Sequence, residues 1–376
     1  MNLSVFSIFF STKLVPLIFT IVGFGLLITM HELGHFIFCK IFGIYTPTFS
    51  LGMGPKIIEK KIGTTNFRLS AIPLGGYVEI AGLAEVGGQG EQEHAQMTGS
   101  NSFESKPYWQ KAIVLLGGVL FNLLFAYMFF SIIYFYGVPK QKAELIINSR
   151  IEKTLQEKFN ITPEDKIISI DNQNLSSEPK ELIPVIQKYF LKKFTNTDII
   201  LLKILRNNED IILNLNFKSE KEQDEFLGSL ELKTTPIEGQ YEKYSLFGAI
   251  KKGIQVTNGW IFNIIYGIKY LITEKTLKGV GGPVMILSKT FQTAQKGFLP
   301  LLIFLCIISI NLAILNILPI GALDGGQFLF VTIEAIIRRP IPEIIKFSIN
   351  IISWVLILGL ILYLSYKDLM SIVWKS

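Results

Sequence analysis

The chain has 376 residues, of which 49% are hydrophobic and only 18% are charged. This composition is typical of an integral membrane protein, and the length leaves room for two or three domains. The formal net charge of +6 does not indicate a nucleic-acid partner, because positive residues commonly flank membrane spans and no basic helix with interleaved aromatic residues is present. Both cysteines fall in or beside apolar segments, so disulfides do not stabilise the polar middle of the chain.

The first predicted element is an apolar run over about residues 14–39, which is long enough to cross a bilayer as a helix. Late in this run stands His31-Glu32-Leu33-Gly34-His35, which contains two of the three histidines of the chain. Polar residues inside hydrocarbon are costly, so a cluster of them in a membrane span indicates a functional site. The alternative is a chance match to the motif on a solvated helix.

His31 and His35 are four residues apart and therefore share one face of a helix, with Glu32 beside them. This is the spacing of two zinc ligands accompanied by a carboxylate that acts as general base. A catalytic zinc needs a third protein ligand and an open position for water. The sequence therefore predicts Zn2+ as the cofactor and requires one more ligand elsewhere in the chain.

The segment from Lys40 to Lys111 carries seven Lys or Arg residues, whereas residues 1–13 carry one. By the positive-inside rule this segment is cytosolic and the N-terminus is outside, so the active site opens towards the cytosol. Residues 56–62 and 67–72 indicate the two strands of a hairpin. With the following residues 73–77, Pro-Leu-Gly-Gly-Tyr, they resemble a hairpin that dips towards the membrane. The alternative is an ordinary cytosolic hairpin.

A linker rich in Gly, Gln and Glu precedes the second span and contains His94, which we expect to be solvated and not a ligand. The second span is predicted over residues 112–136. In it, Gly117 and Gly118 allow the close approach of another helix. Asn122 lies one turn later inside the apolar run and needs a partner, either on another helix or in the catalytic centre.

From residue 139 to about residue 238 the composition becomes polar and β-rich, which predicts one compact inserted domain of about 100 residues. Strands are expected at 143–148, 166–170, 198–206 and 210–217, and helices at 150–159 and 178–193. The chain is thereby divided into an N-terminal membrane part (1–138), the inserted domain (139–238) and a C-terminal membrane part (239–376).

The C-terminal membrane part begins with an amphipathic stretch at 244–278, which we expect on or against the outer membrane surface. A helical segment to about residue 296 leads into the third span, 299–318, and the fourth span covers 345–366. The predicted fold class is a polytopic α-helical membrane protein. It has four transmembrane helices with both termini outside, a membrane-associated β-hairpin and one inserted α+β domain.

Asp324 is the best candidate for the third zinc ligand. It follows the third span and Pro319, which frees backbone groups, and it precedes Gly325 and Gly326, which permit a tight approach. A helix cap or an Asp-Gly turn is the alternative role. Asn316, one helical turn before Pro319, is predicted either to donate to the developing oxyanion or to bond the freed backbone at the end of the span.

Together these motifs resemble the site-2 proteases, which are intramembrane zinc proteases, and most closely the bacterial branch typified by the regulator of sigma-E protease. The resemblance is carried by His31-Glu32-Leu33-Gly34-His35, Asn316-x-x-Pro319 with Leu323-Asp324-Gly325-Gly326, Val280-Gly281-Gly282-Pro283, and Pro73-Leu74-Gly75-Gly76-Tyr77-Val78. It implies zinc and an active site near the cytosolic face of the bacterial inner membrane. It also implies a PDZ-like domain on the extracytoplasmic face, which fits the insert at 139–238.

The resemblance implies a function as well: cleavage of single-span membrane proteins within the bilayer after a first extracytoplasmic cut. The expected substrates are regulators of the anti-sigma-factor type, remnant signal peptides, or both. Well-known members carry two tandem PDZ-like domains, whereas this chain has room for one. The usual Gly-rich carboxylate-binding turn is replaced here by the segment Ile161-Thr162-Pro163-Glu164-Asp165, so we assign no ligand residues in this domain.

Two other classes of protein compete with an enzyme. A catalytically silent membrane scaffold would bind clients through its PDZ-like domain and would lack a zinc ligand or Glu32, but all of these residues are present. A transporter would use intramembrane acids and histidines as an ion path. It predicts internal repeats, which the sequence does not show.

Overall fold

The computed structural model describes residues 10–83, 99–148, 151–177, 199–273 and 280–373. The chain forms two compact units, one made of Met1–Tyr136 with Tyr244–Ser376 and the other of Gly137–Lys243. They are referred to below as the membrane unit and the inserted unit. His94 and the helix predicted at 178–193 lie outside the described residues.

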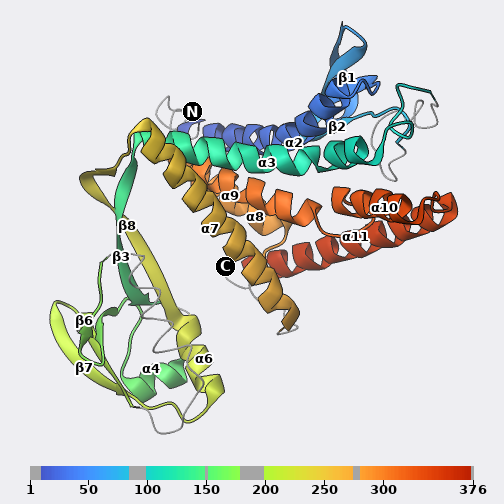
Figure 1. Cartoon of the computed structure of the whole chain (residues 1–376). Coiled ribbons are helices and arrows are strands. Elements are labelled where there is room, and N and C mark those ends of the chain that lie inside the picture. Colours follow the sequence, from blue (N-terminus) through green and yellow to red (C-terminus); the bar gives the residue numbers. More distant parts are fainter. Residues whose placement is uncertain (1–9, 84–98, 149–150, 178–198, 274–279, 374–376) are drawn as a thin grey trace. The chain divides into compact units, whose positions relative to one another are not determined.

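The membrane unit contains four helices that are long and apolar enough to cross a bilayer, which confirms the four predicted spans. They are α2 (Val15–Ile41), α3 (Tyr108–Tyr136), α9 (Phe298–Asn316) and α11 (Glu343–Val373). A short π-helical turn, η1 (Phe10–Leu14), leads into α2. Helix α3 packs against both α2 and α9 and lies beside them in Figure 1.

The contact between α2 and α3 depends on two glycines, as the sequence predicted for Gly117. A Cβ atom added at Gly34 would lie 2.1 Å from the carbonyl oxygen of Gly117. One added at Gly117 would lie 2.7 Å from the carbonyl oxygen of Gly34. The two backbones therefore touch, which is the packing that small residues permit between membrane helices.

The predicted hairpin is confirmed and is longer than expected, with strands β1 (Thr48–Ile62) and β2 (Thr65–Val78). Phe49 of β1 and Phe67 of β2 pack edge-on against Phe36 of α2, with ring centroids 5.2 and 5.6 Å away. In the second half of β1, Ile57 and Ile58 are more than half exposed. The hairpin is therefore anchored to the helix that carries the two histidines.

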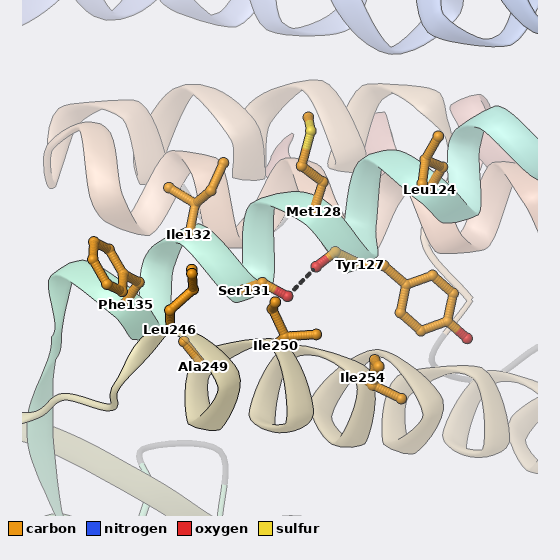
Figure 2. Close-up of a pocket in the computed structure, with 10 residues that line it drawn as sticks. All are labelled: Leu124, Tyr127, Met128, Ser131, Ile132, Phe135, Leu246, Ala249, Ile250 and Ile254. Atoms are coloured by element: carbon orange, nitrogen blue, oxygen red, sulfur yellow. Dashed lines mark hydrogen bonds between the residues drawn. The ribbon is translucent and has the colours of Figure 1, made fainter.

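Three further helices complete the described part of the membrane unit: α7 (Leu246–Thr273), α8 (Pro283–Gln295) and α10 (Asp324–Ile337). The predicted amphipathic stretch is α7, and its buried face packs along α3. A Cβ atom at Gly253 would lie 2.3 Å from Ser131 Oγ, and Tyr127 Oη donates to Asn258 Oδ1 at 2.6 Å. An apolar pocket of about 610 Å³ opens between α3 and α7 (Figure 2).

The inserted unit is built on an antiparallel sheet in the order β7-β6-β4-β3-β8, with β5 paired to β4. Its strands are β3 (Val138–Ile147), β4 (Lys166–Ile170), β5 (Gln173–Asn174), β6 (Ile200–Arg206), β7 (Glu209–Leu215) and β8 (Leu230–Glu242), and its described helices are α4 (Lys153–Phe159) and α6 (Glu220–Ser229). The core includes the fully buried Ile147, Leu202 and Phe226.

The loop that leads into β4 is closed by its own polar groups. Asp165 accepts hydrogen bonds from the backbone N–H and the hydroxyl of Thr162, at 2.7 and 2.9 Å. It also accepts two hydrogen bonds from the guanidinium of Arg206 on β6. Burial acts to raise the pKa of the Asp165 carboxyl, but the bonds from Arg206 and Thr162 outweigh it and hold that pKa below its usual range.

Candidate metal centre

Three side chains that lie far apart in the sequence meet at one point of the membrane unit. Asp324 Oδ2 lies 3.1 Å from His31 Nε2 and 3.6 Å from His35 Nε2, and the two imidazole nitrogens are 3.3 Å apart. His31 and His35 face the same side of α2 because they are one helical turn apart. The structure therefore brings together the three residues that the sequence predicted as zinc ligands.

Asp324 reaches this point because the chain turns back directly after α9. Helix α9 ends at Asn316, and α10 begins with Asp324 itself, so the acid is both a cluster member and the first residue of a helix. A Cβ atom on Gly325 or Gly326 would lie within 2.3 Å of the carbonyl oxygen of Ile317 or Ile320. The two glycines thus permit the tight approach that the sequence indicated.

The three atoms fit the requirements of a zinc ion. Ligand atoms about 2.0–2.1 Å from a tetrahedral zinc are about 3.3–3.4 Å apart, and the observed edges of the triangle scatter around that value. Asp324 Oδ2 is buried and makes no properly directed hydrogen bond within the described part of the chain, although His31 is close to it. A buried carboxylate oxygen without such a bond is costly unless a cation pairs with it.

Glu32 lies on the same helix as the histidines and against the hairpin. A Cβ atom on Gly76 of β2 would lie 3.6 Å from Glu32 Cγ, and Gly76 itself is pressed against the carbonyl oxygen of Ser50 on β1. The Glu32 side chain thus lies beside β2, one residue after His31 on α2.

Two asparagines contact His31 from opposite sides. Asn122 Nδ2 on α3 is 3.3 Å from His31 Nδ1, and Asn316 Nδ2 at the end of α9 is 3.4 Å from His31 Nε2. Of the partners that the sequence left open for Asn122, the structure therefore favours the metal cluster. The backbone of Asn122 also contacts α9, because its carbonyl oxygen accepts a hydrogen bond of 2.8 Å from Ser309.

The second histidine is held by a group that sequence reasoning missed. His35 Nδ1 lies 2.8 Å from the backbone carbonyl oxygen of Val114, so this nitrogen carries the hydrogen and Nε2 is left free to bind a metal. No side-chain pattern reveals a backbone acceptor, and only the register between α2 and α3 identifies it. The role of Ser309 was missed for the same reason.

A membrane unit with four helices of spanning length, and a His-His-Asp cluster with a neighbouring glutamate, have the features of a membrane-embedded metallopeptidase. Residues 19–360 match the family described as Peptidase family M50, and the chain belongs to this family, that of the site-2 proteases. It is an intramembrane zinc metalloprotease with protein substrates and a multi-pass membrane protein of a bacterial family.

Similar proteins come from several bacteria and share nearly their full length with this chain. A protein of Helicobacter pylori strain J99 is 31% identical over 92% of this chain and 95% of its own length. One of Clostridium perfringens is 29% identical over 94% of this chain and 98% of its own length. One of Campylobacter jejuni is 28% identical over 94% and 93%. Each of the three carries the name "Putative zinc metalloprotease".

Proposed function

We propose that this protease resembles the regulator of sigma-E protease in function and cleaves single-span membrane proteins inside the bilayer after a first extracytoplasmic cut. His31, His35 and Asp324 hold the zinc, and Glu32 is the general base. The observation that supports this assignment is the triangle of three ligand atoms with edges of 3.1, 3.3 and 3.6 Å inside a bundle of membrane helices. The substrates proposed are regulators of the anti-sigma-factor type or remnant signal peptides.

The zinc, when bound, polarises the scissile carbonyl and makes a water molecule acidic enough to lose a proton near neutral pH. Glu32 takes that proton from the attacking water and delivers it to the nitrogen of the departing peptide. It follows His31 on α2 and lies beside Gly76 of β2, which supports this role. A glutamine in its place would have nearly the same shape but could not accept the proton.

Asn316 is proposed to stabilise the oxyanion that develops on the scissile carbonyl. Its amide nitrogen is 3.4 Å from His31 Nε2, so a hydrogen-bond donor stands directly beside a ligand atom of the cluster. A donor fixed at such a point stabilises charge that appears only during the reaction. Of the two roles open to Asn316, this contact favours the catalytic one over bonding the end of α9.

The active site is proposed to open towards the cytosol, since the basic segment that contains the hairpin is expected on that side. The inserted unit is then extracytoplasmic and is proposed to be PDZ-like. Its loop at Thr162 and Asp165 is already bonded to itself and to Arg206, so the Thr162 N–H donates within the domain. This supports a domain that does not capture a free C-terminal carboxylate at that loop.

The test combines metal analysis with cleavage of a model single-span substrate. Purified protein is expected to contain one zinc per chain, and the double variant His31→Ala/His35→Ala is expected to contain none. His94→Ala is the control, because the third histidine is predicted to be no ligand. Glu32→Gln is expected to keep the zinc and to lose cleavage. Unchanged zinc in the double variant would refute the ligand assignment, and cleavage by Glu32→Gln at the parental rate would refute the mechanism.

A further inference from the structure

His31 differs from His35 in the kind of group that holds its second nitrogen. In both rings Nε2 faces Asp324. The Nδ1 atom of His35 meets a backbone carbonyl, whereas that of His31 meets the side chain of Asn122 at 3.3 Å. His31 therefore depends on a side chain that a substitution can remove.

The chemistry of a metal ligand fixes which nitrogen of His31 carries the hydrogen. A neutral imidazole that binds a metal through Nε2 has its hydrogen on Nδ1, and this N–H needs an acceptor. We propose that Asn122 is a positioning residue that accepts this hydrogen bond through Oδ1 and so holds His31 in its metal-binding tautomer. The inference rests on the proposed ligand role of His31.

The surroundings of Asn122 support this assignment. In the orientation described, Nδ2 faces His31 Nδ1, and Oδ1 is buried without a hydrogen-bond partner among the described residues. The two ends of an amide are assigned from the hydrogen-bond network because they have nearly the same shape. Turning the amide over places Oδ1 against the Nδ1–H group. It breaks no hydrogen bond of Oδ1, and it satisfies the requirement that a metal on Nε2 imposes.

The position of Asn122 is fixed from two sides, as a positioning role requires. Its backbone carbonyl accepts a hydrogen bond from Ser309 of α9, and both residues are fully buried. One turn earlier, a Cβ atom on Gly118 would lie 2.4 Å from His31 Cε1 and 2.5 Å from His35 Nε2. Helix α3 is therefore pressed against both rings. It places the Val114 carbonyl beside His35 and the Asn122 amide beside His31, in antiparallel order.

The test measures the zinc affinity of the full chain in detergent by competition with a chelating dye. Asn122→Leu removes the acceptor and is expected to lower zinc affinity about 10- to 100-fold, the usual effect of losing such a partner. Asn122→Asp retains an acceptor oxygen and is expected to stay close to the parent. The matched control is Asn311→Leu on α9, since the amide of Asn311 bonds the carbonyl oxygen of Ile307, outside the cluster. The melting temperature of the metal-free protein should be similar in all four proteins.

Parental zinc affinity in folded Asn122→Leu would overturn the inference. An equal loss in Asn122→Leu and Asn122→Asp, or a loss that follows a lower metal-free melting temperature, would also overturn it and assign Asn122 a structural role. If the leucine variant does not fold, Asn122→Ala takes its place. If neither variant folds, Asn122 has a structural role and the inference is overturned.

His31→Ala separates this inference from the proposed function. If His31→Ala keeps its zinc, the assignment of His31 as a ligand fails. If His31→Ala loses zinc and the Asn122 variants do not, only the role of Asn122 fails.

Discussion

At the scale of single residues, the cluster depends on a missing side chain as much as on its ligands. Gly118 leaves space for both imidazoles, since any Cβ atom there would overlap His31 and His35. We expect Gly118→Ala to push the two rings away from Asp324 and to abolish both tight zinc binding and cleavage. Gly267→Ala on α7 is the control, because a Cβ atom there has nothing within 4 Å. Full zinc occupancy and activity in Gly118→Ala would show that α3 can move away at little cost.

The three residues of the cluster could be predicted from the sequence, because their spacing and neighbours are characteristic. The groups that hold the other ring nitrogens of the histidines could not. The four-residue spacing of His31 and His35 indicated a shared face, and the Pro and Gly residues around Asp324 indicated a tight turn. The acceptor for His35 is a backbone carbonyl of Val114, which has no signature in the sequence. The partner of Asn122 stayed open until the register between α2 and α3 placed it beside His31.

At the scale of secondary-structure elements, the long apolar helices and the hairpin could be predicted because hydropathy and turn residues determine them locally. Helices α6 and α10 and strand β8 were not predicted. The start of α10 carries Gly325 and Gly326, which are turn residues in a local pattern. Strand β8 has mostly exposed side chains and forms by pairing with β3. Such long-range pairing is invisible to local patterns.

The hairpin allows a prediction about how substrate is held. A helix in lipid hides its backbone hydrogen bonds, so a substrate must unwind before cleavage, and an edge strand offers it new partners. Residues 66–69 of β2 pair with β1 on both sides, so the free edge of β2 is its end at 76–78, which pairs with 49–51 alone. We expect a proline at Gly76 to slow cleavage of a model substrate without loss of zinc. Gly76→Pro and Gly76→Ala form a matched pair, because both add a Cβ atom and only proline removes the N–H.

If proline and alanine at position 76 behave alike, substrate does not add to the edge of β2. Zinc content must be measured for each variant, since β2 also lies against Glu32. A loss of zinc together with activity would indicate damage to the cluster and not to substrate docking.

In the inserted unit, the bond between β6 and the loop before β4 gives a prediction about stability. The Asp165 carboxylate is 1% exposed and pairs with Arg206, so removing only the guanidinium leaves a buried charge without its partner. We expect Arg206→Gln to destabilise the inserted unit by about 3 kcal/mol at pH 7. Lys203→Gln is the control, because Lys203 and Asp210 form an exposed pair for which about 0.5 kcal/mol or less is expected.

The pH dependence of this effect has a definite sign. The pKa of Asp165 is lower in the folded unit than in the unfolded chain, so its ion pair stabilises the fold above the unfolded-state pKa. That stabilisation is lost as the pH falls through the folded-state pKa. The difference between parent and Arg206→Gln, measured by hydrogen exchange of β6 in the full chain, should therefore shrink towards acidic pH. A difference that stays constant down to strongly acidic pH would contradict the assignment.

At the scale of the whole molecule, the inserted unit is attached at a point far from the chemistry. It follows Tyr136, which is 14 residues after Asn122 on α3, and this distance along the helix is about 21 Å. Among its described residues none is a histidine or a cysteine. We therefore expect the unit to act as a gate that excludes substrates with a bulky outer domain, which makes a first cut outside the membrane a precondition for the second.

Removing the unit tests this role, and the pairing of β3 with β8 shows where to cut. Gln141 and Pro236 are cross-strand partners, so deleting residues 142–235 leaves two neighbouring chain ends that a short Gly/Ser bridge can join. The deletion variant is expected to cleave short substrates at the parental rate and also to cleave full-length ones that the parent refuses. The alternative is a role in folding, which predicts low yield or lost zinc. If the deletion variant cuts short substrates but still refuses full-length ones, the membrane unit itself distinguishes the two kinds of substrate. The helices of that unit are then sufficient to exclude an uncut protein.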